Sequence, residues 1–261
     1  MRRKRKTAFQ QFMIQQHYSG TDELFGIEQG LQGYNLDLVR KLAKGLKTQD
    51  FRDVNYSVLD FGAGTGTLAE VWQKEIGVTP VCIEIDPQLI QVLRAKGFKT
   101  YSEFDEIIVR PNLIYTSNVL EHIENDIEAL KELRDVISPG GSFGIYVPAL
   151  PFLFSDLDRK VGHFRRYRKN ELVDKVSAAG FIVDACFYND SLGVLAALLV
   201  KLLGFKSAAG LGSRKSFIFY DRFIYPVSRI LDQILLSKIV GKNLFLFAHT
   251  NDFEINKKER F

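Results

Sequence analysis

The sequence predicts an α/β protein in which a parallel sheet is covered by helices on both faces, a doubly wound arrangement. Strand-like apolar runs alternate with helix-like segments from about residue 56 to residue 188, which is the order typical of a parallel sheet. The first strand-like run ends in a glycine-rich loop. The 261 residues, 46% of them hydrophobic and 25% charged, suffice for one large domain with its own core.

Local patterns place the individual elements. Apolar residues at helical spacing predict a first helix over 36–46, and the apolar run 56–61 predicts the first strand. Further strands are predicted at 80–85, 99–101, 112–116, 142–147, 181–188 and 243–248, with helices at 67–75, from Asp86 onward, at 126–137 and at 169–179. The carboxyl ends of parallel strands share one edge, so the glycine loop, Glu84, Asn118 and Pro148 are expected together there.

A helical, hydrophobic insert is predicted over about 190–241. Its apolar side chains fall on one helical stripe, and Pro226 is a point at which the helix can kink. The stripe consists of Tyr220, Phe223, Ile224, Val227, Leu231, Ile234 and Leu235. Three roles stay open: a cover for the sheet edge, a homodimer surface, or, together with the basic N-terminus, a surface that docks on an anionic membrane.

Composition limits the partners. The formal net charge is +4, but residues 2–6 are all basic, so the remaining chain is nearly neutral. We therefore expect no nucleic acid partner, since such binding needs a basic face on the folded body. Cys82 and Cys186 lie in separate apolar runs, which predicts reduced thiols and a cytoplasmic protein. No apolar run reaches the ~20 residues that span a bilayer, and the N-terminus is too polar for a signal-peptide core.

The loop after the first strand predicts a nucleoside cofactor. Asp60 ends the strand, and Gly62, Gly64 and Gly66 follow at alternate positions. Glycine allows a sharp turn and lets backbone N–H groups approach a ligand closely. Glu84 ends the next strand, where a carboxylate can accept both ribose hydroxyls. The dinucleotide pattern G-x-G-x-x-A also fits the loop, which keeps an NAD(P)-dependent oxidoreductase as an alternative.

Further segments resemble class I S-adenosylmethionine (SAM) methyltransferases. They are 115–123, 138–141, 147–149, 162–167 (Gly-His-Phe-Arg-Arg-Tyr) and 178–181. These segments are similar to a bacterial branch with methyltransferase domains of types 11, 12 and 23, whose members often accompany or are fused to glycosyltransferases of surface-glycan pathways. The resemblance spans residues 33–250 and implies a Rossmann-like, seven-stranded, mostly parallel sheet with an antiparallel last strand. Residues 1–32 are then a basic arm and residues 251–261 a tail.

The resemblance implies SAM as the cofactor. It places the methionine end on Asp60 and the glycine loop, and the ribose on Glu84. The residues expected to bind SAM are Asp60, Gly62, Ala63, Gly64, Gly66, Glu84, Ile85 and Asn118. Asp86 precedes Pro87, which is typical of a helix N-cap rather than of a ribose ligand.

A second polar cluster predicts the chemistry on the acceptor side. His163 is the first candidate for a general base, because an imidazole beside two guanidiniums suits a hydroxyl on an anionic acceptor. Glu121 and His122 are further candidates, and at the start of an expected helix they are equally consistent with a cap and a packing residue. The residues expected to bind the acceptor are Arg165, Arg166, Tyr167 and Tyr34. Asp156 and Asp158 either orient the histidine or pair with the arginines, and the sequence leaves this open.

Some related quinone-pathway methyltransferases bind a divalent metal through a Glu-x-x-Glu-His set at this place. Asn118 stands where the first Glu would be, so we expect no metal. The sequence as a whole predicts a SAM-dependent methyltransferase that acts on an oxygen of a small or lipid-linked, glycan-related acceptor. A non-catalytic SAM-binding or membrane-associated protein is a second alternative.

Overall fold

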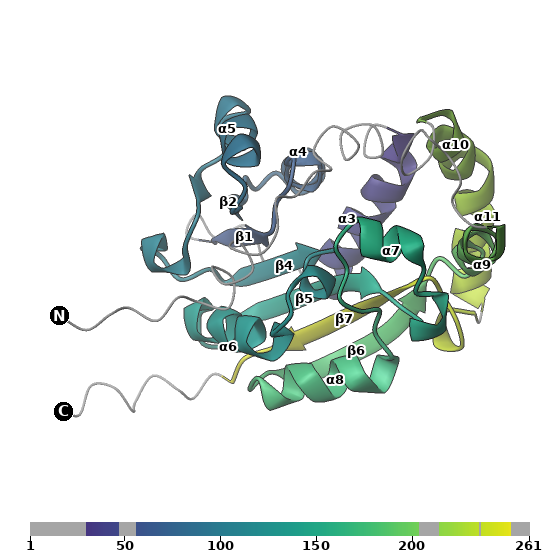
Figure 1. Cartoon of the computed structure of the whole chain (residues 1–261). Helices are drawn as coiled ribbons and strands as arrows, with labels where there is room; N and C mark the ends of the chain where they lie inside the picture. Colours follow the sequence, from purple (N-terminus) through teal and green to yellow (C-terminus); the bar gives the residue numbers. More distant parts are fainter. Residues whose placement is uncertain (1–29, 47–55, 204–213, 235, 252–261) are drawn as a thin grey trace.

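A single seven-stranded sheet organises the molecule (Figure 1). The computed structural model describes residues 30–46, 56–203, 214–234 and 236–251. The predictions made for the basic residues 2–6, for Leu235 and for the tail fall outside these ranges. Along the sheet the strands follow the order β3-β2-β1-β4-β5-β7-β6.

Six strands that run in one direction and one antiparallel strand confirm the predicted fold class. The strands are β1 (Val58–Phe61), β2 (Val81–Ile83), β3 (Thr100–Tyr101), β4 (Leu113–Ser117), β5 (Ser142–Pro148), β6 (Ile182–Asn189) and β7 (Asn243–His249). Strands β1 to β5 pair in parallel, and β7 runs antiparallel to both β5 and β6. The order reverses at β1, where β4 lies on the opposite side from β2. In such sheets the ligand binds at the carboxyl edge, beside the reversal.

Helices connect the strands and cover both faces. They are α3 (Gln32–Gly45), α4 (Thr67–Ile76), α5 (Pro87–Ala95), α6 (Asp126–Val136), α7 (Asp156–Lys160), α8 (Lys169–Ala178), α9 (Gly193–Leu203), α10 (Arg214–Phe219) and α11 (Tyr225–Ile234). Short 3₁₀ turns are η2 (Phe104–Glu106), η3 (Leu120–His122), η4 (Pro151–Leu153) and η6 (Leu236–Lys238), and η5 (Tyr220–Ile224) is a π-helix. The predicted helices agree with α3 to α6 and α8, whereas α7 was not expected.

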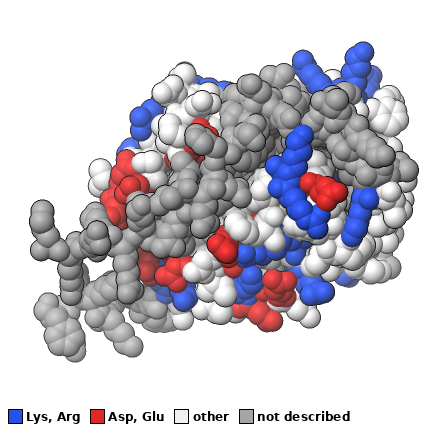
Figure 2. Space-filling model, in the orientation of Figure 1, with Lys and Arg blue, Asp and Glu red and all other residues white. Residues whose placement is uncertain are grey.

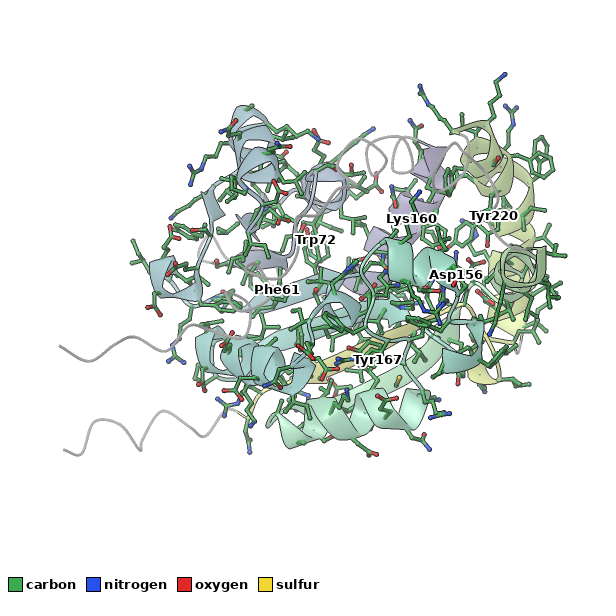
Figure 3. The ribbon with its side chains drawn as sticks, in the orientation of Figure 1. Phe61, Trp72, Asp156, Lys160, Tyr167 and Tyr220 are labelled. Carbon is green, nitrogen blue, oxygen red and sulfur yellow. The ribbon has the colours of Figure 1, made fainter. Side chains whose placement is uncertain are left out.

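The core lies on both faces of the sheet. Successive strand residues point to opposite faces, so Val58 packs with Trp72 of α4 in one apolar cluster and Leu59 packs with Phe61 in the other. Figure 3 labels Phe61 and Trp72, one from each cluster. Helices α3 and α4 complete the face of Val58, and α6 and α8 complete the face of Leu59. Because both faces are buried, the central strands are continuous apolar runs.

The helical insert joins β6 to β7 and emerges at the carboxyl edge. Asn189 at the end of β6 pairs with Asn243 at the start of β7, and Asn243 also pairs with Pro148 at the end of β5. Directly before Pro226 the helix is irregular: η5 is a π-helix, and the N–H of the following residue, Tyr225, donates to the carbonyl of Tyr220. Within the described ranges, no helix is long and apolar enough to cross a membrane.

Candidate active site

The glycine loop is held between β1 and β2 in a conformation that requires glycine. Gly62, Gly64 and Gly66 all have positive φ, at 76°, 58° and 83°, a region in which side chains with a Cβ are strained. The N–H groups of Gly62 and Ala63 donate to the carbonyl of Ile83 at 2.9 and 3.0 Å. The loop is therefore fixed to the end of the neighbouring strand.

The carboxylate of Glu84 faces this loop. Its Oε2 accepts the N–H of Gly64 at 2.8 Å, and its Oε1 accepts the N–H groups of Ile85 and Asp86 at 2.7 and 3.0 Å. Burial raises the pKa of Glu84, although these three backbone donors oppose the shift. An ionised carboxylate accepts about four hydrogen bonds, so Glu84 keeps capacity for a further donor. Asp86 instead accepts the N–H groups of Gln88 and Leu89, which confirms its predicted role as a helix cap.

Asp60 and Asn118 lie at the ends of adjacent strands. Asp60 is buried, and its Oδ2 accepts the hydroxyl of Tyr115 at 2.9 Å. Asn118 follows β4 with a φ of 54° and donates its backbone N–H to the carbonyl of Tyr146. The next residue, Val119, packs on the glycine loop, where a Cβ at Gly62 would meet its Cγ2 at 2.4 Å. The segment after β4 is thus in direct contact with the loop.

The glycine loop and the carboxylates at this edge match the chemical groups of SAM. Positive φ at three glycines keeps side chains away from the loop, and two buried carboxylates stand at the ends of β1 and β2. A ribose offers hydroxyl donors to Glu84, and the cationic sulfonium and ammonium groups of SAM suit an acidic environment such as that of Asp60. The prediction that Ala63, Ile85 and Asn118 also contact SAM stays a prediction.

Glu121 occupies an unusual position directly after this contact. Leu120 to His122 form only the 3₁₀ turn η3, and α6 begins at Asp126 behind the cap Asn125, so the expectation that Glu121 and His122 open a helix is wrong. The Glu121 side chain is fully buried, and neither of its carboxylate oxygens has a hydrogen-bond partner. Burial raises the pKa of Glu121 to about 7.

His163 lies between two carboxylates. Its Nδ1 is 3.0 Å from Oδ1 of Asp158, and its Nε2 is 3.9 Å from Oε1 of Glu121. Burial disfavours charge on Asp158, but bonds from His163 and Arg166 hold its pKa below the usual range. An ionised Asp158 assigns the proton to Nδ1 of a neutral His163 and leaves Nε2 as an acceptor. Asp158 therefore both orients the histidine and pairs with an arginine, the two roles that the sequence left open. Asp156 pairs with Arg159 on the surface.

His122 packs against His163 edge to face, with ring centroids 4.5 Å apart. Burial lowers the pKa of His122 to about 3, so this imidazole stays neutral near physiological pH. Glu121, His122 and His163 each offer a ligand atom, and these atoms lie within 4.8 Å of one another. The expectation of no metal stays a prediction, which elemental analysis of the purified protein checks.

The three residues expected to bind the acceptor after His163 are engaged within the protein. Arg165 pairs with Asp126 at 2.7 Å, and Arg166 donates from Nε to Asp158 at 2.7 Å. Tyr167 is fully buried, and its hydroxyl donates to Asp126 at 2.8 Å. These contacts favour the bracing role of the arginines, and contact with an acceptor stays a prediction. Sequence reasoning missed Asp126, because a carboxylate in the first turn of a helix ordinarily signals only a cap.

Tyr34 joins a buried polar network rather than the His163 cluster. Its hydroxyl contacts the hydroxyl of Tyr146 and accepts the side-chain N–H of Asn243. Asn189 also donates to Tyr146, at 3.0 Å. An acceptor-binding role for Tyr34 therefore receives no support from these contacts and stays a prediction. The sequence signal that could have indicated this network is the pair of asparagines at opposite ends of the insert, Asn189 and Asn243.

The fold and the loop define the class, a Rossmann-like class I methyltransferase. A family model described as a methyltransferase domain matches residues 28–185, more than half of the chain. The chain belongs to this methyltransferase family, and its cofactor is SAM. This finding excludes the NAD(P)-dependent alternative. No curated protein matches the chain significantly.

Solved structures of the same fold share little sequence with the chain. The 4+2 cyclase SpnF has a TM-score of 0.60 at 14% identity, covering 94% of this chain and 97% of its own. Phosphoethanolamine N-methyltransferase 2 of Haemonchus contortus, solved with SAM, has a TM-score of 0.56 at 14% identity over 93% and 60%. A SAM-dependent methyltransferase of Archaeoglobus fulgidus reaches 0.50 at 16% identity over 82% and 94%. One of the three is a cyclase, so the fold alone does not determine the reaction.

Proposed function

We propose that this methyltransferase transfers a methyl group to an oxygen of a small or lipid-linked, glycan-related acceptor, with His163 as the general base. The observation that carries the proposal is the alignment of Asp158, His163 and Glu121. These residues are joined to the cofactor loop by the segment after β4, because Val119 packs on Gly62. The similarity of the segment 162–167 to proteins of surface-glycan pathways supports the acceptor class.

Asp60, Glu84 and the glycine loop would hold the cofactor. SAM, when bound, supplies an electrophilic methyl group. A hydroxyl that accepts this methyl group loses its proton, and Nε2 of His163 takes it. Asp158, hydrogen-bonded to Nδ1 at 3.0 Å, orients the ring and stabilises the imidazolium that forms. Glu121 adds a second carboxylate 3.9 Å from Nε2, and its pKa of about 7 lets its charge respond to that proton near neutral pH.

The state of the two cysteines agrees with the reduced thiols that the sequence predicts. Cys82 is buried, Cys186 is partly buried, and both are free thiols. We propose that the reaction takes place in the cytoplasm, where thiols remain reduced.

The test is methyl transfer from tritiated SAM to fractionated lipid and sugar extracts of the source cell. His163→Ala should lower labelling by ~10²–10⁴-fold while the affinity for S-adenosylhomocysteine (SAH) stays near that of the wild type. His249 provides a matched control, because its Nδ1 is also 3.0 Å from a carboxylate, Asp184, at the opposite end of β7. His249→Ala should label normally.

Each alternative has its own result. Wild-type labelling by His163→Ala would remove the base from the mechanism, and a parallel loss of SAH binding would make His163 structural. A product labelled on nitrogen or carbon would contradict the oxygen acceptor. If no extract is labelled although SAH binds, the non-catalytic SAM-binding alternative is favoured.

A further inference from the structure

The outward side of the insert carries most of the large hydrophobic side chains that are exposed in the described ranges. We call it the insert face. Of the fifteen large hydrophobic side chains that are exposed in the described structure, ten belong to it, with exposed fractions from 42% to 79%. They are Leu195, Leu199, Leu202, Ile218, Phe219, Phe223, Val227, Ile230, Ile234 and Ile239. An apolar surface this concentrated marks an interaction site.

Helix α11 is oriented in the opposite way to an ordinary surface helix, with polar side chains toward the protein and apolar side chains toward solvent. Ser228 and Asp232 are buried against the protein, whereas Val227, Ile230 and Ile234 are 48% to 72% exposed. A helix that merely covers a core places its apolar stripe inward and its polar residues in water. The reversed orientation removes the role of sheet cover from Phe223, Val227 and Ile234 of the predicted stripe and leaves these side chains free for a partner.

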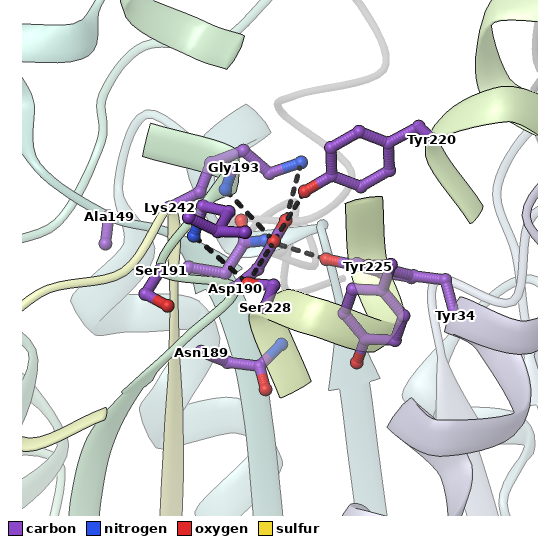
Figure 4. A network of polar contacts seen from close by, with 12 residues as sticks. Tyr34, Ala149, Asn189, Asp190, Ser191, Gly193, Tyr220, Tyr225, Ser228 and Lys242 are labelled. Atoms are coloured by element: carbon purple, nitrogen blue, oxygen red, sulfur yellow. Dashed lines mark hydrogen bonds and ion pairs between the residues drawn. The ribbon is translucent and has the colours of Figure 1, made fainter. Parts of the chain in front are cut away.

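Polar bonds, together with the buried ring of Tyr225, attach the insert to the body. Figure 4 shows Tyr220, Ser228 and Lys242 converging on the buried carboxylate of Asp190. The carboxylate of Asp232 accepts the N–H groups of Asp190 and Ser191. In the middle of the insert, Asp221 of η5 accepts the N–H groups of Gly33 and Tyr34 at 2.9 and 2.7 Å. The insert is thus held in place without using its outer face.

The exposed charges of the insert are all positive in its described part. Six basic residues on the same helices and turns are exposed: Lys201, Arg214, Lys215, Arg222, Arg229 and Lys238. The acidic residues Asp190 and Asp232 are buried, and Asp221 is bonded to the start of α3. In Figure 2, Lys and Arg side chains project at the upper right, over α10. The charge therefore complements an anionic partner.

We propose that the insert face docks on the surface of an anionic lipid bilayer. The aromatic pair Phe219 and Phe223, with ring centroids 5.1 Å apart, would enter the boundary between headgroups and acyl chains, and the basic residues would lie among the lipid phosphates. A second copy of the chain fits less well. A symmetric dimer places the same surface on both sides, so these cations would face one another at a cost.

Docking would bring the acceptor side of the site toward the lipid. The insert leaves and rejoins the sheet at the carboxyl edge, where Asn189 pairs with Asn243. Helix α9 reaches η4 through a hydrogen bond from Lys201 to the carbonyl of Phe152, and η4 leads into α7 and His163. This link to a lipid-linked acceptor rests on the proposed function, whereas the docking itself does not.

Vesicle sedimentation tests the proposal. The full chain should sediment with phosphatidylglycerol vesicles at low salt, less at high salt, and not with phosphatidylcholine vesicles. Phe223→Asp should weaken binding about ten-fold or more, and the double change Arg214→Glu and Lys215→Glu about ten-fold or more. Two matched controls lie away from the insert: Ile108→Asp, at a side chain 86% exposed, and Lys131→Glu, at a side chain 51% exposed. Both should bind normally, and every variant should keep its SAH affinity.

The basic residues 2–6 are a separate source of salt-sensitive binding, so each variant is also measured in a chain lacking residues 1–6. Deletion should weaken binding, and the effect of Phe223→Asp should persist in the shortened chain. The proposal is overturned if the chain stays in the supernatant, or if Phe223→Asp binds like the wild type. It is also overturned if sedimentation velocity shows a dimer that Phe223→Asp dissociates, since the face then belongs to a second copy. Vesicle binding needs no turnover, so it fails or succeeds independently of methyl transfer.

Discussion

At the scale of single residues, two carboxyl groups beside His163 differ in pKa because their surroundings differ. Asp158 is bonded to His163 and Arg166 and stays ionised, whereas Glu121 is buried without a hydrogen-bond partner and has a pKa of about 7. Neighbouring carboxyl groups whose pKa values are shifted in opposite directions are typical of acid–base sites. The same burial makes Glu121 unfavourable for the stability of the fold.

Glu121→Gln should stabilise the protein in a pH-dependent way. The pKa of Glu121 rises from 4.5 in the unfolded chain to about 7 in the folded protein. Its contribution to stability is thus complete below pH 4.5 and is lost as the pH rises through about 7. Gln is neutral throughout, so the variant should match the wild type near pH 4.5 and exceed it by up to about 3 kcal/mol at pH 8. Denaturant titrations at both values measure this.

The control for that change is Glu128→Gln, at a carboxylate 50% exposed on α6, which should leave the pH dependence unchanged. Equal stability of Glu121→Gln and wild type at pH 8 would show that Glu121 is solvated or paired in solution, contrary to its burial in the structure.

Glu84→Ala should weaken SAH binding at least ten-fold, since a charge-assisted contact to the ribose is worth ~1.5–3 kcal/mol. Titration calorimetry of the folded variant measures the loss. Asp86→Ala is the matched control two residues away, because Asp86 caps α5. It should cost ~1 kcal/mol of stability and leave the SAH affinity unchanged. Normal affinity in folded Glu84→Ala would refute the ribose assignment.

At the scale of elements, the glycine loop and the insert show two different uses of local sequence. The loop pattern predicts its own conformation, because only glycine tolerates the positive φ at positions 62, 64 and 66. The stripe of the insert predicts helices but not which side faces the protein. That side is selected by Asp190 and Asp232, whose partners come from the segment after β6, from α11 and from the residue before β7.

Gly64→Val should abolish SAH binding, since a branched side chain at a φ of 58° distorts the loop and fills the space in front of it. Gly77→Val controls for backbone strain alone. Gly77 has a φ of 81° at the end of α4, and an added Cβ there would meet nothing within 4 Å. The control should lose stability but bind SAH. If Gly64→Val binds SAH like the wild type, the loop does not hold the cofactor.

At the scale of the whole molecule, the parallel sheet gathers the ends of β1, β2, β4 and β5 at one edge, and the insert emerges there as well. A ligand held by several of these strands should stabilise the fold as a unit. SAH at about one hundred times its dissociation constant should add ~2.7 kcal/mol, which raises the melting temperature by ~5–10 °C. NAD should not shift it. A shift by NAD and none by SAH would contradict the family's cofactor.

Most of the sheet could be predicted from the sequence, because a strand buried on both faces consists of consecutive apolar residues. The predicted first strand, for example, differs from β1 (Val58–Phe61) by two residues at its start. The candidate site was predictable only in part. Asp60 and Glu84 are identified by their place after apolar runs, whereas the bonds of Arg165 to Asp126 and of Tyr115 to Asp60 join residues 39 and 55 positions apart.

By itself, the sequence predicted the fold class, the glycine loop and the composition of the polar cluster around His163, since each depends on residue types at short spacing, and the resemblance of further segments to a known family implied the cofactor. Only the tertiary structure decided that Asp158 orients His163, that Glu121 is buried beside it, and that Tyr34 belongs to a separate network. It also decided that the insert turns its apolar side outward. The physical reason is that burial and pairing arise between elements distant in the chain, and a local pattern records neither the partner nor the direction a helix faces.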